Sequence, residues 1–222
     1  PSLLARTSRT YLCEIPPVHP LLRIPVSQRC AKNVLKTSVS GMAFPVLVRP
    51  LHSHRGEGLE RIEDAAALQR YESAADEAEY VASEFIDYKS GDGFYRKYRW
   101  IFIDGEAYPH HLAISPDWMV HYFSAPMREH AWMRAEEAAF LTDPRAVFCE
   151  TQMDALQALG AAIGLDYFGV DCTIYDGSVV IFEANANMLA HDFFGEPEFA
   201  YKREPFNTLR LAFDRMLRKE RP

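Results

Sequence analysis

Apolar and polar side chains alternate along two neighbouring stretches of the chain, residues 167–175 and 178–184, as they do in half-buried β-strands. An Asp176-Gly177 dipeptide lies between them and is typical of a β-hairpin turn. The pattern therefore predicts a hairpin with one buried face and one polar face. The face expected to be buried carries Val170, Cys172, Ile174, Val180 and Phe182.

The other face of this hairpin is expected to carry Asp171, Glu183 and Asn185, together with Ile181. Both apolar sets can share one side only if the loop holds an odd number of residues, so we expect a three-residue loop with glycine in a left-handed conformation. A two-residue loop would put the two carboxylates on opposite faces. With the odd loop they lie roughly 5–8 Å apart. Two carboxylates and an amide oxygen can hold Mg²⁺; the alternative is a solvated outer face.

Residues 44–50 read as a short buried strand that ends in Arg49 and Pro50, and a glycine-containing loop follows at 52–58. Glycines let the backbone approach a polyphosphate closely, so that backbone N–H groups can cradle it. Arg49 can add charge-assisted hydrogen bonds to a phosphate. The alternative is a plain surface loop. The candidate phosphate contacts are Arg49, Ser53, His54, Gly56 and Gly58.

Residues 95–103 alternate so that Lys97 and Arg99 fall on one face of a strand and aromatic side chains on the other. Two neighbouring cations repel each other unless an anion lies between them, so this face is a candidate site for phosphate groups. The alternative is a basic outer face that nearby acids neutralise. Residues 79–87 read as a further strand of mixed burial, which ends in Glu84-Phe85-Ile86-Asp87.

The remaining pattern predicts helices at 63–75, 129–140, 146–163 and 204–219, and strands at 106–114 and 118–123. The last two strands carry His110, His111 and His121. A single histidine is more often a structural residue than a catalyst, and we assign no specific role to any of these three.

The hairpin with Asp171, then Glu183-x-Asn185, resembles the metal-binding hairpin of the ATP-grasp superfamily, and the strand and loop around Arg49 resemble its glycine-rich loop. The resemblance covers residues 44–190. It implies an α+β fold in which two subdomains with mainly antiparallel sheets grip ATP between them. The expected division is an N-terminal extension at 1–43, a small subdomain at 44–88 and a large subdomain at 89–222.

The resemblance also implies roles for the polar residues. Asp171, Glu183 and Asn185 match the residues that hold the magnesium ions bridging the ATP phosphates. Arg49 stands where the family usually has lysine, which changes the shape of the cation but not its sign. Lys97 and Arg99 match basic residues that serve phosphate binding and stabilise charge in the transition state.

The end of the strand at 79–87 resembles the hinge on which this superfamily holds adenine. By that match, Glu84 accepts a hydrogen bond from the adenine amino group, and the backbone of Phe85 and Ile86 pairs with the ring edge. Asp87 or Asp92 then reaches the ribose. The alternative is an ordinary edge strand with solvated acids.

The activity that the resemblance implies is an ATP- and Mg²⁺-dependent ligase. It activates a small-molecule carboxylate as an acyl phosphate, which an amine or thiol then attacks. Phosphoryl transfer to a hydroxyl, or a non-catalytic nucleotide-binding module, are the alternatives. Members usually carry another α/β domain ahead of this unit. Only the 43 residues of the extension precede it here, so we expect a missing N-terminal domain or a homo-oligomer.

Composition agrees with a soluble enzyme of 222 residues, 48% of them hydrophobic. A net charge of −7 argues against a nucleic-acid partner. No apolar run approaches the length of a membrane span, so no membrane partner is expected. The four cysteines show no metal or redox spacing, which favours a reducing compartment and a cytoplasmic location.

Overall fold

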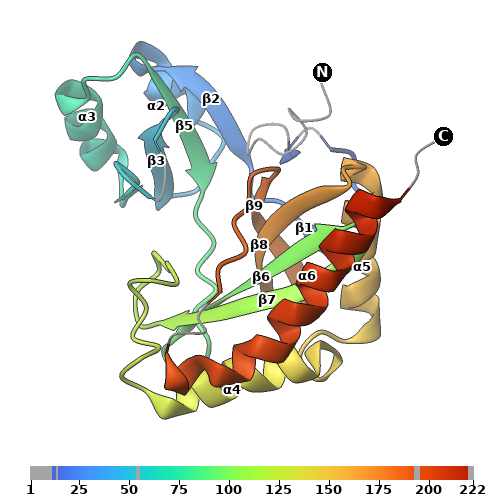
Figure 1. Ribbon diagram of the computed structural model, residues 1–222. Helices are drawn as coiled ribbons and strands as arrows, with labels where there is room; N and C mark the ends of the chain where they lie inside the picture. Colours follow the sequence, from blue (N-terminus) through green and yellow to red (C-terminus); the bar gives the residue numbers. More distant parts are fainter. Residues whose placement is uncertain (1–11, 14, 54–55, 193–195, 220–222) are drawn as a thin grey trace. The chain divides into compact units, whose positions relative to one another are not determined.

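The computed structural model describes residues 12–13, 15–53, 56–192 and 196–219. The chain folds into two compact units, each with one β-sheet and its own helices (Figure 1). The larger unit comprises residues 1–23 and 88–222, and the smaller unit comprises residues 24–87. Among the strands of the described residues, neighbours are antiparallel in all but one case, which confirms the expected α+β class.

Five strands form the sheet of the larger unit, in the order β1-β9-β8-β6-β7, and only β1 and β9 run parallel. The strands are β1 (Leu22–Arg23), β6 (Tyr95–Ile103), β7 (Glu106–Ser115), β8 (Tyr167–Tyr175) and β9 (Ser178–Asn185). The helices are α4 (Ala131–Thr142), η3 (Pro144–Ala146), α5 (Glu150–Ile163), η4 (Pro197–Lys202) and α6 (Arg203–Arg218).

Aromatic side chains fill the space between one face of this sheet and helices α4 and α5. Trp100 of β6 meets Phe140 of α4 edge to face, with ring centroids 5.4 Å apart. Phe102 stacks on Phe168 of β8 at 4.5 Å. Helix α5 comes so close at Gly160 that a Cβ there would lie 2.7 Å from Phe102. These contacts bury the aromatic face of β6, as its alternation predicts.

Helix α6 covers one end of the opposite face (Figure 1). Ile101 and Ile103 of β6 pack in a cluster with Leu209 of α6. Side chains alternate along a strand, so Lys97 and Arg99 lie on this same face, beyond the apolar cluster. The fold thus divides one sheet face into an apolar end under α6 and a polar end.

The smaller unit is a four-stranded antiparallel sheet in the order β2-β5-β3-β4. Its core includes Leu35, Val46, Val48, Leu68 and Tyr80, all of them almost fully buried. The elements are β2 (Ser27–Ala31), η2 (Lys32–Val34), α2 (Leu35–Ser38), β3 (Val46–Pro50), β4 (Glu60–Ile62), α3 (Ala65–Ala74) and β5 (Glu79–Glu84).

This unit begins at residue 24, whereas the sequence placed its start at 44. The physical reason is that β2 pairs with β5 along its whole length, and that Leu35 of α2 is fully buried in the same core. Residues 24–43 therefore belong to the smaller unit, to which they contribute a strand and part of the core.

The hairpin of β8 and β9 differs from the expected one in its loop. Tyr175 pairs with Ser178, so the loop has two residues, and the expected three-residue loop is wrong. Asp176 and Gly177 both have positive φ, at 48° and 73°, as a tight hairpin turn requires. Such a loop alone would put the two carboxylates on opposite faces.

A β-bulge restores the expected arrangement. Cys172 pairs with Ile181, whereas Asp171 pairs with Glu183, so Phe182 is an extra residue in β9. The bulge supplies the odd residue that was expected in the loop. Asp171 and Glu183 therefore do share a face, although the expected buried set is partly wrong, because Ile181 joins Cys172 and Val180 joins the face of Asp171.

The expected strand at 118–123 is also wrong, since the chain forms turns there. Val120 and Tyr122 are buried, and the residues next to them in the chain are more exposed. Buried and exposed residues therefore alternate here as expected, but without strand pairing. The expected helix at 146–163 begins only at Glu150, and the other three expected helices lie within two residues of their predicted ends. No helix in the described part of the chain is long and apolar enough to cross a membrane.

We predict that Gly169→Ala lowers the free energy of unfolding by about 1–3 kcal/mol, because overpacking forces neighbours out of place. A Cβ at Gly169 would lie 2.1 Å from Met188 Cγ and 3.2 Å from Ile101 Cδ1. Urea unfolding measures the change. Gly91→Ala is the matched control, because no heavy atom lies within 4 Å of its Cβ position. Equal unfolding midpoints for the two variants would contradict this packing.

Candidate functional site

The polar end of the larger sheet carries a group of charged side chains that contact one another. Arg99 of β6 lies directly opposite Asp171 of β8. Its Nε and Nη2 atoms donate to Asp171 Oδ1 at 2.6 Å and Oδ2 at 2.9 Å, and Lys97 Nζ lies 3.5 Å from Oδ2. We call the part of the face that carries these three residues, Glu183 and Asn185 the charged face.

The charge state of Asp171 is fixed by its two cations. Burial would raise the pKa of its carboxyl, but the charges of Lys97 and Arg99 outweigh this effect, and the pKa falls to about 2. Burial would lower the pKa of Arg99, yet Asp171 raises it. Asp171 is therefore a buried carboxylate at neutral pH, and its negative charge is compensated.

Glu183 and Asn185 extend this face on β9. Glu183 pairs with Asp171 and Asn185 pairs with Gly169, so both side chains lie on the side of Asp171. Asn185 Nδ2 donates to Glu183 Oε1 at 3.3 Å, and the backbone N–H of Asn187 donates to Asn185 Oδ1 at 2.8 Å. These bonds orient the amide oxygen and the second carboxylate beside the first.

The donor atoms of this trio fit Mg²⁺, which prefers oxygen ligands. Each Asp171 oxygen accepts a hydrogen bond from Arg99. Because a carboxylate has about four lone-pair sites, lone pairs are still left that could coordinate a metal ion. Within the described ranges, no three His, Cys, Asp or Glu side chains form a group that could hold a metal ion. The expected set has the amide of Asn185 as its third ligand, and this role stays a prediction.

A second bulge, in β7, places histidines beside the charged face. Arg99 pairs with His111 and Trp100 pairs with Pro109, so His110 is an extra residue. Both histidines are buried, and burial is the main reason that their pKa values lie below the usual range, at about 3 for His110. Three histidines within a dozen residues marked this region in the sequence, but alternation alone does not reveal the bulge.

No sequence pattern indicated the buried network that lies next to these histidines. Lys202 Nζ lies 2.7 Å from Glu137 Oε1 and 2.6 Å from the hydroxyl of Tyr122, which itself donates to Glu137 Oε2 at 2.9 Å. Burial lowers the pKa of Lys202 to about 8, although Glu137 opposes this shift. The three residues come from η4, α4 and the turns after β7, so no local pattern connects them.

In the smaller unit, Arg49 does not extend freely from the end of β3. It is buried, its Nε donates to Ser53 Oγ at 3.1 Å, and its Nη2 donates to the Ser53 carbonyl. Ser53 Oγ in turn donates to the carbonyl of Pro50 at 2.9 Å. Arg49 thereby holds the first turn of the loop. Gly56 and Gly58 have positive φ, and His54 lies outside the described residues.

The residues expected at the adenine and ribose have the following surroundings. Glu84 Oε2 accepts from the N–H of Val26 at 3.3 Å, and the Phe85 ring lies 4.9 Å from the guanidinium of Arg61. Ile86 is buried and Asp87 is exposed. Their roles toward a nucleotide stay predictions.

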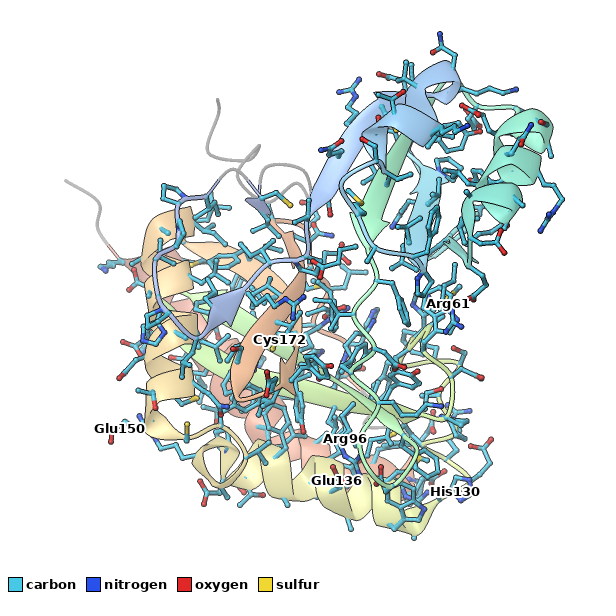
Figure 2. All side chains as sticks on the ribbon, turned by 180° about the vertical axis from the view of Figure 1, so that it is seen from behind. Arg61, Arg96, His130, Glu136, Glu150 and Cys172 are labelled. Carbon is cyan, nitrogen blue, oxygen red and sulfur yellow. The ribbon has the colours of Figure 1, made fainter. Side chains whose placement is uncertain are left out.

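Asp92, the alternative ribose contact, belongs to the larger unit. It accepts from Arg96 at 3.1 and 2.7 Å, and Arg96 also donates to Glu136 of α4 at 2.9 Å (Figure 2). This network anchors the segment before β6 to α4, and the role of Asp92 toward a ribose stays a prediction.

Known structures resemble this fold at low sequence identity. D-alanine–D-alanine ligase from Bacillus anthracis, complexed with ATP, is 14% identical with a TM-score of 0.50, over 90% of this chain and 62% of that one. A RimK domain protein ATP-grasp from Sphaerobacter thermophilus is 15% identical with a TM-score of 0.53, over 97% and 69%. The macrocyclase MdnC from Microcystis aeruginosa, bound with precursor peptide MdnA, is 12% identical with a TM-score of 0.52, over 96% and 62%.

The chain therefore has the ATP-grasp fold, which confirms the fold expected from the resemblance. It spans between 62% and 69% of the length of these three structures. No family model and no curated protein matches the sequence.

We predict that Asp171→Asn changes the acid stability of the protein. The folded pKa of about 2 lies below the ordinary value of 3.8, so Asp171 contributes stability above pH 4 that is lost as the pH falls toward 2. Between pH 5 and 2, the free energy of unfolding should fall by up to about 2 kcal/mol more in the wild type than in the variant. Urea unfolding at several pH values measures this difference.

The control for this experiment is Asp104→Asn, which removes an exposed ion pair with Lys219. Exposed pairs contribute little to stability, so its pH profile should follow that of the wild type. Parallel profiles for Asp171→Asn and the wild type would show that Asp171 is not held ionised by its cations.

Proposed function

We propose that this protein is an ATP- and Mg²⁺-dependent ligase of the ATP-grasp type, acting on a carboxylate and an amine or thiol. The observation that carries the proposal is the charged face. There, two carboxylates and an amide lie on a sheet face beside two cations that compensate one of the carboxylates. The ATP-grasp fold supports the same conclusion.

The charged face supplies binding and electrostatic stabilisation. Mg²⁺ would be held by Asp171, Glu183 and Asn185. When bound, it would neutralise the charge that develops on the transferring phosphoryl group. Arg99 keeps Asp171 ionised and oriented, because its guanidinium group donates a hydrogen bond to each of the two carboxylate oxygens. Lys97 adds a second positive charge where the phosphate oxygens would lie. Such catalysis depends on positioning and electrostatics and requires no side-chain nucleophile.

The proposed reaction has two steps. A carboxylate oxygen of the substrate attacks the γ-phosphorus of ATP, and the bond from that phosphorus to the β-phosphate oxygen breaks, giving an acyl phosphate and ADP. The amine or thiol then attacks the acyl carbon. Phosphate leaves with the electron pair of the C–O bond, and the attacking group loses its proton to solvent.

For the smaller unit, we propose contacts to the nucleotide. The loop that starts at Arg49 and Ser53 supplies backbone N–H groups for the phosphates, and the positive φ of Gly56 and Gly58 supports this role. The backbone of Phe85 and Ile86, with Glu84, would contact adenine, and Asp87 the ribose. We infer a cytoplasmic location from the four cysteines, whose spacing fits no metal or redox motif.

We predict that Glu183→Gln weakens Mg²⁺-dependent nucleotide binding and lowers substrate-dependent ADP release about 100-fold, since it removes a metal-ligand charge. The fold should survive, because Glu183 is only half-buried. Titration with a non-hydrolysable ATP analogue, with Mg²⁺ and then with chelator, measures the binding. Coupled detection of ADP across a metabolite panel measures the turnover.

Glu106→Gln is the matched control, as it makes the same change at an exposed position of the same sheet. The metal assignment would be wrong if chelator did not change nucleotide binding by the wild type. It would also be wrong if Glu183→Gln and Glu106→Gln changed binding and turnover equally. A phosphorylated acceptor as the final product would indicate a kinase, and binding without turnover on any substrate would indicate a nucleotide-binding module.

A further inference from the structure

The chain that follows strand β9 turns back over the sheet face that carries Asp171. The backbone N–H of Met188 donates to the carbonyl of Asn185 at 3.2 Å, which closes a turn at residues 185–188. Met188 is buried and lies directly over Gly169 of β8, where the side chain of any other residue would collide with it. The glycine therefore lets the segment after the turn lie flat on the sheet.

Tyr167 of β8 holds the far end of this turn. Its side chain is on the same face of the strand as Gly169, because side chains alternate along a strand. The Tyr167 hydroxyl donates to the carbonyl of Met188 at 2.6 Å, and its ring packs edge to face on Phe213 of α6, with centroids 5.4 Å apart. Burial raises the pKa of Tyr167, so the hydroxyl keeps the proton that it donates.

The near end of the same turn carries the side-chain amide of Asn185. The backbone N–H of Asn187 donates to Asn185 Oδ1 at 2.8 Å, and Asn185 Nδ2 donates to Glu183 Oε1 at 3.3 Å. Only the oxygen of an amide can accept a hydrogen bond, so the turn decides which way the amide points. A second lone pair of the oxygen is left, and this lone pair could coordinate a metal ion.

We propose that Tyr167 is a positioning residue for the candidate metal site. By holding the Met188 carbonyl, it keeps the turn at 185–188 in the conformation that orients Asn185 Oδ1. Tyr167 acts through the backbone, because the hydrogen bonds lead from its hydroxyl to Met188 and from Met188 to Asn185. The inference rests on the proposed function, in which Asn185 is a ligand of Mg²⁺. Groups that orient a metal ligand in this way contribute to metal affinity without touching the metal.

The first measurement that tests this role requires no metal. Exchange of backbone amides with water is measured by NMR in the whole ¹⁵N-labelled chain, for the wild type and for Tyr167→Phe, which keeps the ring and removes the hydroxyl. We expect the amides of Asn187 and Met188 to exchange up to about tenfold faster in the variant, since a hydrogen bond that favours the turn is lost. The amide of Gly164, which ends helix α5, should keep its rate.

The second measurement is the affinity for Mn²⁺ in the presence of excess non-hydrolysable ATP analogue. Tyr167→Phe should weaken Mn²⁺ binding about tenfold, the lower end of the effect that partners of metal ligands have. Tyr108→Phe is the matched control. Tyr108 of β7 packs against the same apolar cluster as Tyr167, and its hydroxyl makes no hydrogen bond with another described residue. Its Mn²⁺ affinity and the exchange of Asn187 should equal those of the wild type.

Three results would overturn the proposal. The first is unchanged exchange of Asn187 and Met188 in Tyr167→Phe. The second is faster exchange with unaltered Mn²⁺ affinity, because Tyr167 would then order the segment without positioning the ligand. The third is an equal loss of affinity in Tyr108→Phe, which would show a general effect of packing.

The wild type decides even if the Tyr167 variant fails to fold. An Asn187 amide that exchanges as fast as in an unfolded chain would mean that no stable turn orients Asn185, and this would contradict the proposal. If the wild type bound no Mn²⁺, the ligase proposal would fail. The exchange rates of the metal-free protein would still support or contradict the role of Tyr167 in the turn, so the two failures are distinguishable.

Discussion

The ion pair between Arg99 and Asp171 is the interaction on which the candidate site depends. It joins β8, the central strand of the larger sheet, to its neighbour β6 through two hydrogen bonds on a buried face. A buried carboxylate without a partner would take up a proton rather than stay charged. Because Arg99 and Lys97 compensate Asp171, a negative group can exist there at neutral pH beside Glu183. The same cations are the groups that we propose to contact the phosphate oxygens.

Two β-bulges decide which side chains reach this site. The bulge at Phe182 brings Glu183 and Asn185 to the side of Asp171, and the bulge at His110 inserts a buried histidine into β7 next to the residue that pairs with Arg99. Each bulge adds one residue to one strand, which changes the face of every residue beyond it. Functional geometry on this sheet therefore arises where regular pairing is interrupted, while the aromatic core on the other face keeps the strands in place.

Alternation in the sequence predicted the shared face of Asp171, Glu183 and Asn185 and the face of Lys97 and Arg99, and the resemblance to the ATP-grasp superfamily predicted the α+β fold. It failed where pairing is irregular: the odd residue of the hairpin lies in a bulge, because Asp-Gly readily forms a two-residue turn. It also failed at 118–123, where turns bury Val120 and Tyr122 as a strand would. Lys202 and Glu137 were missed because they are far apart in the chain, and only tertiary packing brings them together.

The most direct test of the central claim locates the metal. Mn²⁺ with a non-hydrolysable ATP analogue is added to the labelled protein in place of Mg²⁺, and paramagnetic broadening of the NMR signals is recorded. The account predicts strong broadening of the Asn185 side-chain amide and of the backbone signals of Asp171 and Glu183, and little at the exposed Glu106. Sharp signals at these three residues, with broadening elsewhere or nowhere, would contradict a metal site on the charged face.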